Sequence, residues 1–281
     1  MKTEHIHGHI IAITPIHHGG DESTGARATL RRMKYLVDGK RVEIPVISGN
    51  SIRGVLRRLI MAHMLETLGY GKRTEEGEAD DRMKSMKAYH MLFSGGTLES
   101  VEDSGAIDLA LRRELRTSLP ALSVFGSAIG NQMIEGKMKC GIAVPVCTEL
   151  AAFQPGEQAT NSIYELLTDD FTTRKDDIHG EREEGEAAHQ MIVNFECFAP
   201  GTTFVHKFSL LDCTEVERAI LDKALQLWTA RPYIGGKSSI GYGEVKLSYL
   251  SEYHTEAYDR FLVEQADKMR ATIEKIEGIL G

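Results

Sequence analysis

Three arginines, Arg53, Arg57 and Arg58, have the residue type and the spacing needed to bind phosphate along one side of a helix. Arg53 and Arg57 lie four residues apart, and Gly54 between them has no side chain to keep a ligand at a distance. Guanidinium groups bind phosphate through paired N–H donors, and the free amide groups of a helix N-terminus also favour an anion. A solvated basic helix face would have the same spacing, so the pattern alone leaves both interpretations open.

The stretch from Ile44 to Leu68, IPVISGNSIRGVLRRLIMAHMLETL, predicts the helix that carries these arginines. Ser48-Gly49-Asn50-Ser51 supplies a glycine turn and two possible N-caps, and Gly69 is a suitable C-cap. Apolar residues recur between them at helical spacing and should form the buried face: Ile52, Val55, Leu56, Leu59, Ile60 and Met64. The sequence therefore predicts a strand end, a tight turn and a cationic helix, in this order.

The loop that follows a predicted first strand, PIHHGGDESTGARATLRR, combines glycines with potential phosphate donors. The glycines allow a ligand to approach the backbone closely, and imidazole and guanidinium groups can donate hydrogen bonds to it. The candidate donors are His17, His18, Arg27, Arg31 and Arg32.

A second glycine-rich stretch, ARPYIGGKSSIGYGEVKLSYL, lies near the far end of the chain. Lys237, Ser238 and Ser239 stand between two pairs of glycines there, with Tyr242 close behind. The residue order is not that of a Walker loop, and the stretch does not open a helix. Backbone amides, a lysine and two hydroxyls can still cradle phosphates, or the loop can pack against another backbone segment.

The charge distribution favours one anion-binding face on an otherwise acidic protein. The whole chain has a net charge of −8, which by itself argues against a nucleic-acid binder. The window from Arg27 to Arg58 nevertheless carries +7, which leaves −15 on the remainder. A solvated patch that happens to be basic would give the same count.

The segment from His5 to Thr14 predicts a strand with His5, His7 and His9 on one face. These histidines could ligate a metal ion, but no acidic or thiol residue lies nearby in the sequence, and half-exposed strand histidines need no ligand role. The cysteines form neither a C-x-x-C pair nor a metal spacing, which favours free thiols: Cys140, Cys147, Cys197 and Cys213. We therefore predict no metal site and no cofactor.

The length of 281 residues and the hydrophobic content of 42% suffice for a substantial core, in one large or two small domains. No apolar run reaches the roughly 18 residues of a membrane span, and the start MKTEHIHGHI has no signal-peptide pattern. We therefore expect a cytoplasmic protein with no membrane partner.

The other elements expected from the pattern are strands and helices. A hairpin at 35–45 turns at Asp38-Gly39, and a second hairpin joins strands 191–198 and 202–211 through Ala199-Pro200-Gly201. A further strand is expected at 137–146, a capped helix from Thr214, and one amphipathic helix at 254–281.

Two segments are rich in charge. Residues 70–119 predict a helical insertion outside the core, whose basic residues could touch a partner or could simply be solvated: Lys84, Lys87, Arg112, Arg113 and Arg116. The segment 160–189 contains nine acidic residues against three basic ones, which is typical of a disordered loop or of a protruding hairpin that orders against a partner.

The order of these features resembles the repeat-associated mysterious protein (RAMP) superfamily of CRISPR-associated proteins. The resemblance runs from Glu4 to about Leu250 and rests on ISGNSIRGVLRR, the VFG turn, the acidic segment, APGTTF and GGKSSIGYGEV, in this order. Within the superfamily the chain looks most like the backbone subunit that polymerises along the guide RNA, the seventh numbered Cas family, in its type III and type IV forms.

The resemblance implies an α+β fold with a ferredoxin-like, RRM-like βαββαβ palm. The chain would form one palm domain over 1–281, with the helical insertion at 70–119, a thumb hairpin at 160–190 and the C-terminal helix at 254–281. By the same resemblance, the guide RNA would be held by Asn50, Ser51, Arg53, Arg57 and Arg58, by His17, His18, Arg27, Arg31 and Arg32, by Lys237, Ser238, Ser239 and Tyr242, and near the thumb base by Arg174 and Lys175.

One departure from the family concerns catalysis. Type III backbone subunits cut target RNA with an Asp ahead of the turn that here is Ser48-Gly49, and the matching position lies near Arg31 to Met33, where no carboxylate stands. Without a general base or metal ligand the subunit should bind without cleaving, in a DNA-targeting or type IV complex. The implied partners are guide RNA, a DNA or RNA target, further copies of the chain and other effector subunits.

Two alternatives remain at this point. One is a metal-dependent ribonuclease that acts on target RNA with Asp21, Glu22 or the pair His17 and His18. The other is a phosphate-ligand protein or metallohydrolase that uses the histidine strand.

Overall fold

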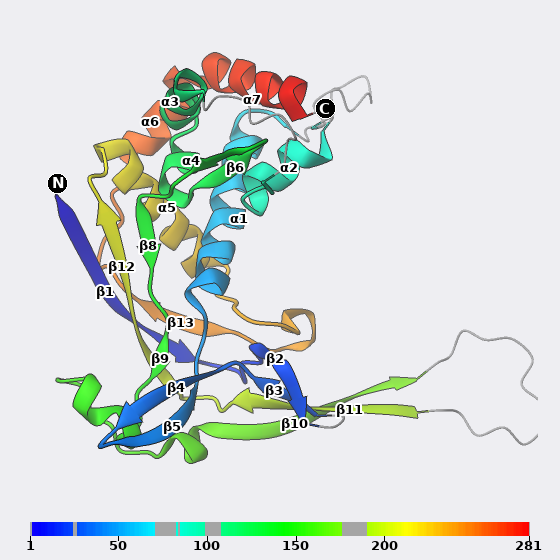
Figure 1. The fold of residues 1–281 in the computed structure, drawn as a ribbon, viewed down its shortest axis with the longest axis vertical. Helices are drawn as coiled ribbons and strands as arrows, with labels where there is room; N and C mark the ends of the chain where they lie inside the picture. The colour runs from blue at the N-terminus through cyan, green and yellow to red at the C-terminus, as the bar shows by residue number, and fades with distance from the viewer. Residues whose placement is uncertain are drawn as a thin grey trace, which may run out of the picture.

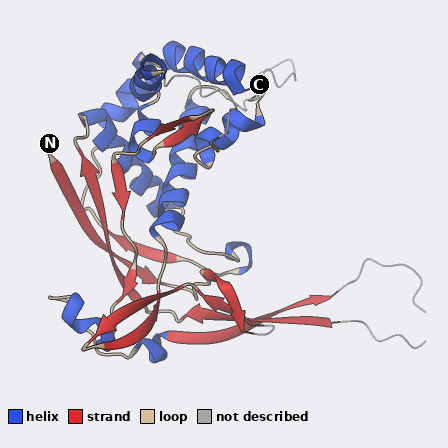
Figure 2. Cartoon of the chain, in the orientation of Figure 1, coloured by secondary structure: helices blue, strands red, loops and turns tan. Residues whose placement is uncertain are grey.

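The computed structural model describes residues 2–24, 27–70, 83, 85–98, 108–175 and 190–280, with the backbone alone for 21–24, 174–175 and 190–191. The α-helices gather at one end of the molecule, and most of the strands lie at the other end and along one side (Figures 1 and 2). Within this part of the chain, no helix is long and apolar enough to span a membrane.

An antiparallel sheet with two helices on one face forms the palm. Its strands lie in the order β13, β1, β12, β8, with the short β9 also paired to β12. Their bounds are β1 Thr3–Ala12, β8 Met138–Cys140, β9 Val144–Pro145, β12 Thr203–Leu211 and β13 Val245–Ser248, and the helices are α1 Gly49–Thr67 and α5 Glu215–Ala230. Along the chain the order is β1, α1, β8, β12, α5, β13, which confirms the predicted α+β, ferredoxin-like βαββαβ palm.

Alternation along β1 decides which face of the palm sheet is covered. Ile6 and Ile10 are buried beneath α1 and α5, whereas His5 and His7 are exposed on the open face. His7 lies opposite Lys207 of β12 in the strand register. The prediction that the three histidines share one face is therefore confirmed.

The start and end of α1 follow the sequence prediction. The Ser48 side chain accepts a hydrogen bond from the Ser51 amide at 3.2 Å, and Gly69 just past the C-cap has a φ of 95°. A Cβ atom on Gly49 would lie 2.3 Å from the Gly141 carbonyl oxygen, so only glycine lets the helix begin this close to the strand linker.

His206 on β12 is buried as a neutral imidazole. Its Nε2 lies 3.0 Å from the Gly141 carbonyl oxygen and its Nδ1 lies 2.9 Å from the Tyr249 hydroxyl, so one nitrogen donates and the other accepts. Burial lowers the pKa of His206 to about 4.

Acidification should therefore destabilise the fold. Between about pH 6.5 and pH 4 the unfolded chain binds a proton at this position and the folded chain does not, so His206 withdraws up to about 3 kcal/mol of stability across that window. His18 and His63, whose pKa values burial also lowers, act in the same direction. Urea unfolding at pH 7 and pH 4.5 checks this, because His206→Gln should lose less free energy between the two pH values than the wild type. Equal losses would contradict it.

The helices at the end of the molecule away from the second sheet belong to the main core. This differs from the prediction that residues 70–119 form an insertion outside the core. These helices are α2 Met86–Phe93, α3 Leu109–Ser118, α4 Pro120–Phe125, α6 Glu256–Glu264 and α7 Ala266–Leu280. Met91 of α2 and Leu115 of α3 are fully buried in the same cluster as the palm. The predicted single C-terminal helix is wrong, because the chain leaves helical geometry at Gln265; this lets α6 pack on α5 while α7 packs on α2 and α3.

Below the palm a second sheet carries a long hairpin, whose arms project well beyond the body (Figure 1). Its strand order is β10, β11, β3, β2. The bounds are β2 Gly19–Thr24, β3 Arg27–Leu30, β10 Leu167–Lys175 and β11 Gln190–Phe198. Part of the segment expected as a loop after Pro15 thus forms strands, because β3 adds in parallel to β11. Residues 176–189 of the predicted thumb lie outside the described residues.

Short elements complete the fold. They are the hairpins β4 Arg32–Val37 with β5 Lys40–Pro45 and β6 Ser127–Ile129 with β7 Gln132–Ile134, and the 3-10 helices η1 Thr148–Phe153, η2 Ile163–Leu166 and η3 Ser238–Ile240. The strand expected at 137–146 is divided into β8 and β9, each pairing with a different part of β12. All four cysteines are free, as predicted.

Candidate nucleic-acid interface

The three arginines of α1 differ sharply in their surroundings. Arg53 is half-buried and Arg58 is exposed, and neither side chain has a hydrogen bond or ion pair in the described part of the chain. Arg57 is only 3% exposed, and its Nη2 donates to the carbonyl oxygens of Phe125 and Gly126, each at 2.6 Å. Burial, and next the charge of Arg53, lower the pKa of Arg57 to about 10.

Arg57 is therefore a structural tie between α1 and the end of α4. Its guanidinium also lies 5.8 Å from the centre of the Phe125 ring. This corrects the expectation that Arg53 and Arg57 share an exposed face, because the second side of α1 is covered by residues 125–126.

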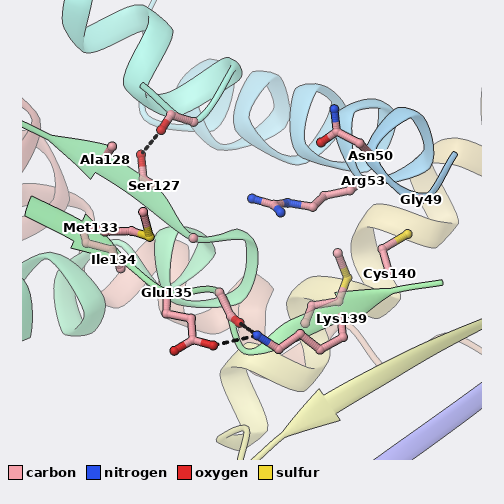
Figure 3. A pocket seen from close by; sticks show the side chains of 14 residues that line it. Gly49, Asn50, Arg53, Ser127, Ala128, Met133, Ile134, Glu135, Lys139 and Cys140 are labelled. Atoms are coloured by element: carbon pink, nitrogen blue, oxygen red, sulfur yellow. Dashed lines mark hydrogen bonds and ion pairs between the residues drawn. The ribbon is translucent and has the colours of Figure 1, made fainter. Parts of the chain in front are cut away.

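Two cavities lie along the free arginines. The larger, about 470 Å³, opens between the start of α1 and the β6–β7 hairpin, and it is lined by Asn50, Arg53 and Lys139 among others. Figure 3 shows the Arg53 side chain extending from the helix into this space. A neighbouring cavity of about 270 Å³ is lined by Asn50, Ser51, Arg53, Arg58 and Ser94. The exposed side of α1 thus offers unpaired cations and helix N-terminal groups in two neighbouring cavities, both of which Arg53 lines.

The histidine loop is fastened to the start of α1 and to β11. The Ser48 amide donates to Nε2 of His18 at 3.2 Å, which requires that nitrogen to be unprotonated. Burial lowers the pKa of His18, with smaller effects from Arg31 and His17, and this keeps it neutral. His17 has its Nδ1 2.8 Å from the Glu196 carbonyl oxygen and its ring edge against Phe195.

The arginines of this loop are divided between free and paired. Arg31 is exposed, and no partner for its side chain occurs among the described residues. Arg32 lies 2.6 Å from the carboxylate of Glu196, which is 5% exposed and also accepts from the Leu30 amide. Arg27 pairs with Asp169 and lies 3.7 Å from Glu196.

The second glycine-rich loop contacts the histidine loop and β11. The Gly236 amide donates to the His17 carbonyl oxygen at 2.8 Å, and Lys237 places its Nζ 4.1 Å from the centre of the Phe195 ring. Tyr242 donates its hydroxyl to Asp170 at 2.6 Å; burial and then Asp170 raise its pKa to about 12. Ser238 and Ser239 are exposed in η3.

The base of the β10–β11 hairpin joins the two loops, and the sequence did not predict this role. It supplies Asp169, Asp170, Phe195 and Glu196, which contact the groups described above. Arg174 and Lys175 lie at the outer end of β10, opposite Met191 and Gln190 in the register, and their side chains are outside the described residues. The structure thus brings the α1 start and both loops together and leaves Arg174 and Lys175 farther along the hairpin.

Comparisons with known proteins found similar solved structures and a matching protein family. A chain from a structure titled "Type IV-B CRISPR Complex" is similar, with a TM-score of 0.61, 24% sequence identity, and coverage of 92% of this chain and 98% of that chain. At this identity the similarity shows the fold alone. No curated protein matched the chain. The family model described as the RAMP superfamily matches residues 9–246, so the chain belongs to the RAMP superfamily, as predicted.

Proposed function

We propose that the chain is a non-catalytic backbone subunit of a CRISPR effector complex, which binds guide RNA and oligomerises along it. The observation that carries the proposal is the set of unpaired cations at the start of α1. Arg53 and Arg58 line the α1 cavities, and Arg31 belongs to the loop whose His18 is bound by the Ser48 amide. A polyanion would compensate these charges, and membership of the RAMP superfamily together with the likeness to a CRISPR-complex chain supports RNA as that polyanion.

Such contacts suit a subunit that must accept any guide sequence. Phosphate contacts fix the position of a strand but carry no base information, so the target would be selected by base pairing to the guide. The partners in this proposal are guide RNA, a DNA or RNA target, other copies of the chain and other effector subunits. Repeated copies along one strand require head-to-tail contacts, which form open helical filaments when they do not close.

The non-catalytic assignment rests on the positions and partners of the carboxylates near the two loops. None occupies 31–33, and the carboxylates nearest the loops are already engaged: Asp169 and Glu196 by arginines, and Asp170 by Tyr242. Within the described residues, no group of three or more histidine, cysteine, aspartate or glutamate side chains is placed to hold a metal ion. The side chains of Asp21 and Glu22 lie outside that part, so the ribonuclease alternative requires an experiment.

The deciding experiment incubates the assembled complex with complementary RNA and magnesium. We expect intact RNA over hours. Cuts at regular spacing that disappear with Asp21→Ala would establish the nuclease instead. A cleavage unaffected by Asp21→Ala, by Glu22→Ala and by the replacement of His17 and His18 with Ala would point to a contaminant.

Removing the acid that holds Arg27 should strengthen RNA binding. Asp169 is 63% exposed, and an exposed ion pair contributes about 1 kcal/mol or less, so a phosphate can displace it. Asp169→Asn should therefore lower the Kd for guide RNA about 2- to 5-fold. Fluorescence anisotropy measures this, with Asp267→Asn, which breaks an exposed pair with Arg270 on α7, as the matched control. Weaker binding by Asp169→Asn would show that the pair orders the interface rather than competing for Arg27.

A further inference from the structure

A second basic groove lies at the helical end of the molecule. It is formed by α3, α4, the start of α5 and Phe261 of α6, and its volume is about 670 Å³. The lining is mainly apolar, including Leu109, Val216 and Phe261, and one rim carries Arg112, Arg113 and Arg116 of α3. Nothing in the proposed RNA contact at α1 uses this groove.

The positive charge of this rim is not compensated by acids. Arg112 and Arg113 have no hydrogen bond or ion pair through their side chains in the described part of the chain, and Arg116 donates only to the Glu135 carbonyl oxygen, at 2.8 Å. Among the acids around the rim, Glu114 is held by Lys275 at 2.6 Å, Glu217 by Lys137 at 2.7 Å and Glu135 by Lys139 at 2.7 Å, and the carboxylate of the N-cap Asp108 accepts from the Leu111 amide.

Like charges at i and i+4 on a helix repel each other. Arg112 and Arg116 have this spacing, and Arg113 adds a third cation between them. In a chain of net charge −8, a cluster of three arginines whose neighbouring acids are already paired with lysines has the electrostatics of an anion-binding surface.

The groove is joined to the α1 cavity by one turn. Residues 135–137 lie between β7 and β8; Glu135 and Gly136 line the larger α1 cavity, and Lys137 lines the groove. On the other side, Arg116 binds the Glu135 carbonyl oxygen, while Lys139 holds the Glu135 carboxylate at 2.7 Å (Figure 3). Cations therefore continue from Arg53 past Lys139 to the rim of α3.

We propose that this α3 groove binds a single-stranded segment of nucleic acid, with phosphates on Arg112, Arg113 and Arg116 and bases against the apolar floor. The inference rests on the proposed function and extends it to a second contact. Stacking of bases on apolar and aromatic side chains and pairing of phosphates with arginine are the two interactions that single-strand binding uses. Continuity with the α1 cavity favours nucleic acid over an acidic protein segment. The strand is either the same guide RNA farther along or the strand paired to it, and both present this chemistry.

The test variant carries Arg112→Glu and Arg113→Glu together. The matched control carries Lys246→Glu and Lys268→Glu, at two exposed lysines. One arm measures the Kd of labelled guide RNA for the protein. The other measures the Kd of a labelled complementary strand for the guide-loaded complex, and both arms are repeated at several salt concentrations.

We expect the α3 variant to bind about 10-fold or more weakly in one arm, with the slope of log K against log salt reduced by about 1.4, the value for two phosphates of a single strand. The arm that changes identifies the strand. Arg112→Ala with Arg113→Ala should show the same loss of slope, which separates charge contact from a folding defect caused by the reversed charges.

Unchanged Kd values in both arms would overturn the groove while leaving the α1 interface intact. A variant that keeps its Kd and salt slope but assembles fewer copies per RNA would show a protein–protein surface, and this also overturns the inference. Failure of the wild type to bind RNA at all would instead overturn the proposed function.

Discussion

Arg53→Glu combined with Arg58→Glu should weaken guide RNA binding about 100-fold at low salt and reduce its salt slope by about 1.4, as expected for two lost phosphate contacts on a single strand. Both guanidinium groups are unpaired and line the same cavity along α1. Charge reversal removes two attractive contacts and places two carboxylates where phosphates would lie, so the loss exceeds that of Arg→Ala.

From the sequence alone, the double variant would change Arg53 and Arg57. The structure shows that Arg58 is the better second position. Arg57 is buried and holds two carbonyl groups, so its replacement would damage the fold and the RNA result could not be interpreted. Changing Lys246 and Lys268 to Glu alters the net charge equally without touching the α1 cavities. If both double variants lose the same affinity, long-range charge explains the effect and α1 is not the interface.

Glu196→Ala should lower the free energy of unfolding by about 3 to 5 kcal/mol, the range for removing one partner of a buried ion pair. The Glu196 side chain is 6% exposed, lies 2.6 Å from Arg32 and accepts from the Leu30 amide at 3.0 Å. Its loss leaves both donors without this acceptor and removes the side-chain link between Leu30 at the end of β3 and β11, which then keep only their backbone pairing. The two loops that meet at the hairpin base should then lose their common support.

Urea unfolding of three variants separates the contributions. Glu196→Gln keeps an acceptor for the Leu30 amide and should lose less than Glu196→Ala, and Asp169→Ala, at an exposed pair with Arg27, should lose about 1 kcal/mol or less. A loss below 1 kcal/mol for Glu196→Ala would show that Glu196 does not hold the loop to the hairpin.

Local pattern was enough to predict single elements of the palm, whereas their βαββαβ arrangement was implied by the resemblance to the RAMP superfamily. The helical repeat of Ile52, Leu56, Ile60 and Met64, and the alternation of strands such as 203–211, come from burial on one side of an element, which the sequence records directly. The capping serine and the glycine after the helix also predicted the limits of α1, because a serine hydroxyl binds a free amide at the helix start and glycine adopts the positive φ that ends the helix.

Burial on a second side of an element, and pairing over long distances, leave no such pattern. Arg57 is covered by residues 68 positions away, and neighbouring residues in α1 give no sign of it. The window from Arg27 to Arg58 counts as +7, yet Arg27 and Arg32 are paired with acids 142 and 164 positions away. Charge counting therefore found the basic face but overestimated its free cations, and the hairpin base that organises it could not be predicted.

The number of chains bound per RNA tests the central claim most directly. Purified protein is mixed at low salt with RNAs of increasing length, and the mass of each complex is measured by native mass spectrometry. A backbone subunit predicts that the copy number rises in regular steps with RNA length, and that Arg53→Glu with Arg58→Glu abolishes the series. A single copy at every length, or a monomer without RNA, would contradict the proposed function.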